Sequence, residues 1–277
     1  MAQRYERRQV LERLREEINQ DRPLLMFGAG TGLTARCAEL GGADIIAVYS
    51  TAYYRMQAQS SLLAWLPYEN ANELVLEMAR EILPAVKDTP CIVGIGAHDP
   101  HLNLDRFMAK LLDLGCSGFT NEPFVGIYGP EFGVQLEAAG LGFSREVELI
   151  RTCHRQDLFT VAWAFNPEEG RLLAEAGADV IGAIVGVTTG GLTGTKQTLS
   201  LKDTAEQIEA IYQAAAAVNP DIIVLTHGGP LKDVETAEYS LIHTSAAGYA
   251  SGSSGERIPT ETAVTKITRQ YKNCRIK

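Results

Sequence analysis

The chain has 277 residues, 45% of them hydrophobic, which is enough apolar material to bury a large core. Its formal net charge of −9 argues against broad binding to nucleic acid or to an anionic membrane, because both need an extended basic face. The sequence has no apolar run of about 18 residues, and its charged start lacks the apolar stretch of a signal peptide. We therefore expect a cytoplasmic globular protein.

A helical pattern at about residues 3–19 precedes a unit that recurs along the chain. The unit is a short β-branched run, then a glycine-rich or polar stretch, then apolar residues at helical spacing. Such runs predict strands at 24–30, 43–50, 91–97, 117–123, 158–165, 178–186, 221–229 and 248–254. Helical spacing predicts helices that include 71–86, 104–115, 144–156, 166–177, 200–218 and 260–272.

Strands that are apolar on both faces and alternate with helices are typical of a parallel sheet covered by helices. Eight of them is the number that closes a barrel. The prediction is therefore an α/β fold, a (β/α)8 TIM barrel with an additional N-terminal helix. We expect one domain over 1–277, with the helix in 1–20 and the barrel in 21–277. The competing open sheet usually carries a GxGxxG fingerprint, which residues 28–33 match only approximately.

Two connections, 50–70 and 121–144, are longer than usual for loops that follow a barrel strand. They follow the second and fourth predicted strands. Long loops at the carboxyl ends of strands are where barrels place binding and closure. We therefore expect both segments to lie at the mouth of the barrel.

Polar residues and glycines gather just after the predicted strands, where barrel chemistry is built. Glycine lets backbone N–H groups approach an anion, and hydroxyls add donors, although glycines that only shape turns are the alternative. Arg257 is either a carboxylate clamp or a surface arginine. The mouth also contains Trp163 and, without a specific role, Arg55 and Glu256. The predicted substrate-binding residues are Gly28, Gly30, Thr31, Tyr49, Ser50, Thr188, Thr189, Gly190, Gly228, Ser253 and Arg257.

Three titratable residues are candidates for catalysis: His227, Asp99 and Glu122. His227 is either a packed core histidine or a general acid or base, and its place at a strand end before two glycines favours a functional role. Asp99 and Glu122 end neighbouring strands, so they either hold a divalent cation, Mg²⁺ or Mn²⁺, or act as a base or orient water. A turn or helix-capping role for Asp99 is the alternative.

Several motifs in order carry a family resemblance: "GAGTGLTARCAELGGADIIAVY", "MAREILPAVKDTPCIVGIGAHDP", "EAGADVIGAIVGVTTGG", "IIVLTHGGP" and "SGSSGERIPTE". Together they resemble the phosphoenolpyruvate hydrolase-like TIM-barrel family, which is similar to the phosphoenolpyruvate mutase and isocitrate lyase superfamily. The resemblance covers about residues 8–270. It implies a (β/α)8 barrel, a homo-oligomer, a small-molecule 2-oxo acid or enol substrate, and frequent assistance by a divalent cation. It also implies that 49–72 lies over the active site.

Two loops depart from the family pattern. The chain has Tyr-Ser-Thr-Ala-Tyr at 49–53 where members read Tyr-Asn-Ser-Gly-Arg, and it has Glu122 where they read phenylalanine. These changes and the aromatic residues Tyr53, Tyr54, Trp65 and Trp163 indicate a changed, larger and less polar substrate. The sequence thus predicts an enzyme that works through an enolate, either phosphoenolpyruvate hydrolase-like or a carbon–carbon hydrolase or lyase. A non-catalytic barrel that binds a small anion is the alternative from another class.

Overall fold

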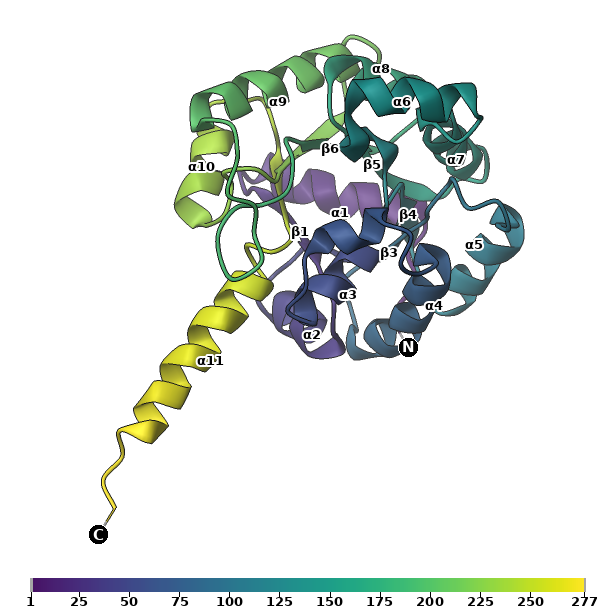
Figure 1. The fold of residues 1–277 in the computed structure, drawn as a ribbon. Helices are drawn as coiled ribbons and strands as arrows, with labels where there is room; N and C mark the ends of the chain where they lie inside the picture. Colours follow the sequence, from purple (N-terminus) through teal and green to yellow (C-terminus); the bar gives the residue numbers. More distant parts are fainter. Residues whose placement is uncertain (1, 277) are drawn as a thin grey trace.

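Eight parallel strands form one closed barrel in the order β1 to β8 in the computed structural model, which describes residues 2–276 (Figure 1). Every strand lies inside a range that the sequence predicts, so the (β/α)8 barrel is confirmed. The strands are β1 (Leu24–Gly28), β2 (Ile45–Val48), β3 (Cys91–Gly94), β4 (Gly118–Thr120), β5 (Phe159–Ala164), β6 (Val180–Ile184), β7 (Ile223–His227) and β8 (Gly248–Ser251).

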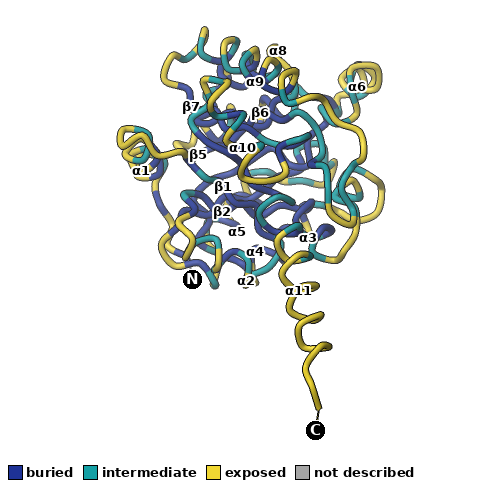
Figure 2. The backbone as a smooth tube through the Cα atoms, turned by 90° about the vertical axis from the view of Figure 1, so that its left-hand side faces the viewer, coloured by how far each residue is buried: buried dark blue, intermediate teal, exposed yellow. Residues whose placement is uncertain are grey.

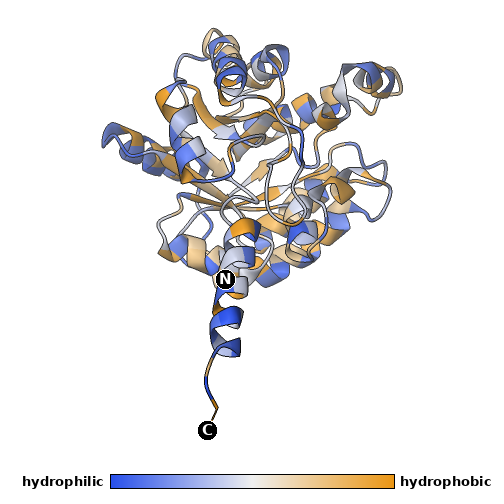
Figure 3. Ribbon diagram, turned by 60° about the vertical axis from the view of Figure 1, so that its left-hand side comes forward, coloured by the Kyte–Doolittle hydropathy of each residue, from blue (hydrophilic) through white to orange (hydrophobic). Residues whose placement is uncertain are grey.

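The strands are the most buried part of the chain (Figure 2). All six residues of β5 are buried, because inward side chains pack in the barrel and outward ones pack under helices. Pairing of Phe27 with Ser251 joins the first strand to the last and closes the sheet. Figure 3 shows the result as a hydrophobic centre with hydrophilic outer surfaces on the surrounding helices.

The helices follow the strands in alternation and begin with local capping signals. Asn166 before Pro167 accepts a hydrogen bond from the Glu169 N–H, for example, and thereby satisfies a free donor of the first turn. The helices are α1 (Arg7–Asn19), α2 (Gly32–Leu40), α3 (Ser50–Met56), α4 (Ala71–Ile82), α5 (Leu104–Asp113), α6 (Gly129–Ala138), α7 (Phe143–Arg155), α8 (Pro167–Glu175), α9 (Leu201–Ala216), α10 (Val234–Ile242) and α11 (Arg257–Lys272).

The two long connections contain secondary structure of their own. The first holds α3 and the 3₁₀ helix η1 (Ser61–Trp65), and the second holds the 3₁₀ helix η3 (Val125–Tyr128) and α6. A third 3₁₀ helix, η2 (Leu83–Ala85), continues α4 toward β3. Helices α2 and α10 lie outside the predicted helical ranges, because each buries only one or two small residues, Ala35 in α2 and Ala237 and Ser240 in α10, which leaves no clear apolar spacing.

Helix α1 lies across the amino-terminal end of the barrel and contacts β1 and β5, which lie on opposite sides of it. Val10 and Leu14 are its buried residues, and Arg7 forms an ion pair of 2.8 Å with Asp179 at the start of β6. The additional N-terminal helix therefore closes the end of the barrel opposite the mouth.

Helix α11 leaves the barrel after β8 and projects away from it (Figures 1 and 2). Its apolar residues Val264 and Tyr271 are 57% and 71% exposed, and Arg257 is its one buried residue. The root of the helix is therefore fixed, and the rest has little contact with the described part of its own chain.

Candidate active site

A cavity opens at the carboxyl ends of the strands, the end where barrel enzymes place their chemistry. Its walls come from the segments after β2, β4, β6 and β8 and from the ends of β5 and β7. It is lined by Tyr49, Thr51, Arg55, Ser61, Trp65, Glu122, Phe124, Ile127, Trp163, Ile184, Gly186, Val187, Thr188, His227, Gly252 and Ser253.

His227 ends β7 and presents its ring to the cavity. Its Nδ1 lies 2.6 Å from the carbonyl oxygen of Ala250 on β8. A carbonyl oxygen can only accept, so Nδ1 carries the proton and Nε2 keeps a free lone pair. Burial lowers the pKa of His227 to about 4, which keeps the ring neutral near pH 7.

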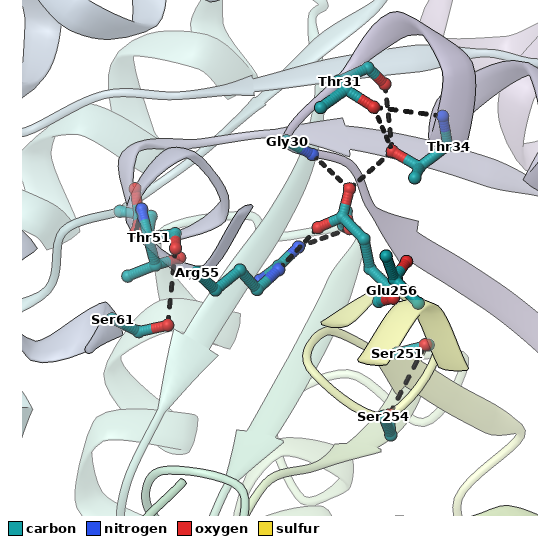
Figure 4. A network of polar contacts seen from close by, with 12 residues as sticks. Gly30, Thr31, Thr34, Thr51, Arg55, Ser61, Ser251, Ser254 and Glu256 are labelled. Carbon is teal, nitrogen blue, oxygen red and sulfur yellow. Dashed lines mark hydrogen bonds and ion pairs between the residues drawn. The ribbon is translucent and has the colours of Figure 1, made fainter. Parts of the chain in front are cut away.

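Arg55 and Glu256 form a buried ion pair beside the cavity, shown in Figure 4. The Arg55 Nε donates to Glu256 at 2.6 Å, and an Nη2 hydrogen bond reaches the carbonyl oxygen of Gly28. The other Glu256 oxygen accepts from the Gly30 N–H at 2.6 Å and from the Thr34 hydroxyl at 2.5 Å. The Glu256 carboxylate thus accepts from three donors, and the Arg55 guanidinium donates to Glu256 and Gly28, so that both charges have partners inside the protein.

Glu122 follows β4 and is buried at the start of α3. Its carboxylate accepts hydrogen bonds from the Ser50 N–H and the Thr51 N–H, both at 3.1 Å, and from the Ser50 hydroxyl. Burial raises the pKa of Glu122, and these donors oppose the rise. Most of the hydrogen bonds that the Glu122 carboxylate accepts therefore come from the first turn of α3.

The packing of Tyr49 explains why glycine occupies position 28, at the end of β1. A Cβ atom on Gly28 would overlap the Tyr49 hydroxyl, and the Tyr49 ring lies 5.8 Å from the guanidinium carbon of Arg55. Burial raises the pKa of Tyr49 to about 12, so the phenol stays protonated near pH 7. Gly28 therefore serves by allowing close packing of Tyr49 at the cavity wall.

A third buried carboxyl group, that of Glu146, holds the loop after β4. Glu146 on α7 accepts hydrogen bonds from the Val125 N–H at 2.7 Å and from the Asn121 amide. The Asn121 side-chain oxygen also accepts from the backbone N–H of Trp163 at 2.7 Å, which ties the loop to β5. Burial raises the pKa of Glu146 to about 8. These contacts fix the position of Phe124 and Trp163 in the cavity wall.

The structure brings five predicted site residues together in the cavity wall: Tyr49, Glu122, Thr188, His227 and Ser253. Ser50 lies directly behind Glu122, and Gly28 and Gly30 support the ion pair. The others serve the surrounding loops. Thr31 caps α2, the Thr189 N–H bonds the carbonyl of Gly229, Gly228 packs against the carbonyl of Gly186, and Arg257 donates to Gly190 and pairs with Glu261.

Asp99 lies apart from Glu122. It lines a separate cavity, and its carboxylate accepts from the Asn70 and Asn72 amides and from the His101 N–H. Among residues 2–276 no group of three or more histidine, cysteine or acidic side chains is placed to hold a metal ion. The carboxylate oxygens of Glu122 already accept hydrogen bonds from backbone N–H groups. The side chains at this cavity therefore do not fit as direct ligands of Mg²⁺ or Mn²⁺.

Sequence reasoning gives no specific role to the site residues Arg55 and Glu256, and it gives Trp163 only an apolar one. Glu256 follows a strand, as the other mouth residues do, but its partner Arg55 lies on α3, inside a segment expected to be a loop. A buried arginine at one end of the chain and a buried acid at the other form no local pattern. Only the three-dimensional pairing shows their connection.

The family model for phosphoenolpyruvate hydrolase-like proteins matches residues 9–274. The chain is 42% identical over 265 residues to the ToMV susceptible protein tm-1(GCR26) of Solanum lycopersicum, covering 95% of this chain and 35% of that protein. It is 30% identical to the putative transcriptional regulatory protein y4pA of Sinorhizobium fredii, with coverage of 96% and 44%. The chain thus spans about a third of the tomato protein and under half of the bacterial one.

Solved structures share the fold at low sequence identity. Phosphonopyruvate hydrolase in complex with oxalate and Mg²⁺ superposes with a TM-score of 0.63 at 15% identity, covering 95% of this chain and 87% of that one. Oxaloacetate acetylhydrolase gives a TM-score of 0.59 at 16% identity with the same coverage. Within the part of the chain that the structure describes, no helix has the length and apolar character needed to cross a membrane.

Proposed function

Since the chain belongs to the phosphoenolpyruvate hydrolase-like family, we propose that it is an enzyme that acts on a small carbonyl substrate through an enolate. The observation that carries this proposal is His227, whose tautomer is set by Ala250 and whose ring lines the cavity. A neutral histidine with a free Nε2 is suited to general base catalysis.

In the proposed step, Nε2 of His227 takes a proton from a water molecule as the water oxygen adds to the substrate. An O–H bond breaks, an N–H bond forms, and the C–C or P–O bond that then breaks leaves its electron pair on the departing fragment as an enolate. Burial makes the protonated ring costly, and the enolate formed beside it offsets that cost. The hydroxyls of Thr188 and Ser253 lie in the same cavity wall and supply donors for the developing charge.

Two reactions share this enolate: phosphoenolpyruvate hydrolase-like chemistry on an enol phosphate, and carbon–carbon cleavage of a 2-oxo or β-dicarbonyl acid. The aromatic wall favours the second. Ring centroids of Trp65 and Phe124 lie 5.0 Å apart, and those of Phe124 and Trp163 lie 6.1 Å apart. Apolar groups on a substrate gain free energy when such surfaces bury them.

The test of this function is His227→Asn, screened for turnover against phosphoenolpyruvate, 2-oxo acids and β-dicarbonyl acids with and without Mg²⁺. Asparagine keeps a donor for the carbonyl of Ala250 but removes the base. We expect kcat to fall by about a hundredfold or more, with an unchanged melting temperature.

The matched control is His243→Asn on α10. This exposed histidine makes a similar hydrogen bond to the Tyr239 carbonyl and lies outside the cavity, so kcat should not change. Equal activity of His227→Asn and wild type excludes the histidine as the base. Absence of turnover on the whole panel favours the non-catalytic barrel that binds a small anion.

We also propose that the protein assembles as a homo-oligomer through α11. The eighth helix of a closed barrel normally packs outside it, between the helices that follow the first and seventh strands. Here α11 projects outward, and α2 and α10 carry exposed apolar residues, namely Leu33, Leu40, Val234 and Ile242. A second copy of α11 fits the chemistry of that surface.

The variant Val264→Glu/Ile267→Glu tests this assembly, because both residues lie on one face of α11 and are 57% and 44% exposed. Light scattering coupled to size-exclusion chromatography should give a multiple of 30.1 kDa for the wild type and a shift toward 30.1 kDa for the variant. Lys266→Glu, on the opposite face, is the control and should keep the wild-type mass. A monomeric wild type at tens of micromolar contradicts the proposal.

A further inference from the structure

One donor in the cavity wall has no acceptor. The chain has two tryptophans, and both line the cavity. The Trp65 Nε1 donates to the carbonyl oxygen of Phe124 at 2.7 Å, whereas the buried Trp163 Nε1 has no hydrogen-bond partner among the described residues. A buried donor without a partner is unfavourable, so such a group in a native protein needs an explanation.

The position of Trp163 is set by its surroundings on several sides. Its six-membered ring covers Gly182 of β6, where a Cβ atom would overlap it. Its other neighbours are Phe124, with ring centroids 6.1 Å apart, and His227, with centroids 5.1 Å apart. The indole N–H and the free Nε2 of His227 therefore belong to adjacent rings in one wall. They form an uncharged donor and acceptor pair.

The charges around the cavity favour an uncharged or singly charged ligand. Among the described lining residues Arg55 is the one arginine or lysine, and Glu256 already neutralises it. Glu122 adds an acidic group. A phosphate ester carries a charge of about −1.5 to −2 near pH 7, and buried charge without a partner is strongly unfavourable. Phosphoenolpyruvate, which adds a carboxylate to its phosphate, is therefore poorly matched to this cavity.

The apolar part of the wall indicates what else the ligand carries. Trp65, Phe124 and Phe165 form a connected aromatic group, with Phe124 and Phe165 centroids 5.1 Å apart. Trp65 and Phe124 line the cavity, and Phe165 packs behind Phe124. An aromatic or branched substituent placed there is removed from water and gains free energy in proportion to the area buried.

Resting on the function proposed above, we infer that Trp163 binds the substrate carbonyl oxygen through Nε1, and that the substrate is an uncharged or singly charged carbonyl compound with an apolar substituent. The hydrogen bond holds the carbonyl next to His227, within reach of a water molecule that Nε2 deprotonates. When the enolate forms, the same N–H faces the oxygen that gains negative charge, where its stabilising effect increases.

Binding by isothermal titration calorimetry tests this inference without requiring turnover. The probes are 4-phenyl-2-oxobutanoate, 4-phenylbutanoate, which lacks the 2-oxo group, and phosphoenolpyruvate. We expect wild type to bind 4-phenyl-2-oxobutanoate at least about tenfold more tightly than phosphoenolpyruvate. We expect Trp163→Phe, which removes the N–H and keeps an aromatic ring, to weaken the oxo acid about tenfold and to leave 4-phenylbutanoate nearly unchanged.

Three results overturn the inference: phosphoenolpyruvate binding as tightly as the oxo acid, an equal loss for both phenyl acids in Trp163→Phe, or no binding of the oxo acid below about 1 mM. The wild-type comparison stands even when the variant fails to fold. The proposed function is tested separately by turnover. A binding contrast without turnover in the substrate panel contradicts the function alone, and turnover without the contrast contradicts this inference alone.

Discussion

Glu256→Gln should lower the free energy of unfolding by about 3 kcal/mol, because it leaves the buried Arg55 charge without its counter-charge. Glutamine keeps the size of the side chain and an acceptor for the Gly30 N–H. The loss therefore reports the charge and not a cavity. The measurement is urea unfolding of both proteins at one fixed protein concentration. Their free energies of unfolding are compared where the dependence on urea concentration has the same slope.

Two controls separate this effect from a general loss of charge. Glu168→Gln breaks an exposed pair with Arg171 on α8 and should leave the free energy of unfolding nearly unchanged. Adding Arg55→Met to Glu256→Gln removes the stranded cation and should recover part of the lost stability. A Glu256→Gln variant as stable as wild type, or no recovery in the double variant, contradicts the assignment of this pair as a buried and coupled unit.

The stability of the wild type should fall relative to His227→Asn by about 3 kcal/mol as the pH drops from about 7.5 to below about 4. In the unfolded chain this histidine takes up its proton near the ordinary histidine pKa of 6.5, whereas the folded protein keeps it neutral down to about 4. The unfolded state therefore binds the extra proton first. The contribution of the neutral His227 ring to stability is fully present above pH 6.5 and is lost as the pH falls through 6.5 toward about 4.

The comparison with His227→Asn is needed because other buried groups change the free energy of unfolding with pH in the opposite direction. The pKa values of Glu122 and Glu146 are raised in the folded state, so their contribution is lost as the pH rises. Taking the difference between the two proteins at each pH removes these contributions. His243→Asn should follow the wild-type curve. Parallel curves for wild type and His227→Asn would show that the ring is not held neutral.

The barrel could be predicted from the sequence because strands buried on two faces are runs of β-branched residues that stand out from helical spacing. The strand ends then located His227 and Glu122, because all parallel strands end at one mouth. The long connections were harder. Helix α3 has seven residues, too few for a clear period, and α6 has no buried residue to mark its inner face.

What could not be predicted are contacts between distant segments. Asp99 and Glu122 follow neighbouring strands, yet the first turns to the amides of Asn70 and Asn72 and the second to the start of α3. The local sequence gives no sign of either partner. The same holds for the free indole of Trp163, because the absence of an acceptor among the described residues is a property of everything around it.

The pair of Arg55 and Glu256 also has a consequence for how the protein is made. The two residues are 201 positions apart, and the second comes after the last strand. A ribosome releases the chain from its amino end, so all of β1 to β7 emerges before Glu256 does. During that interval the Arg55 guanidinium has no counter-charge, and the site reaches its working form only after the whole barrel has been synthesised.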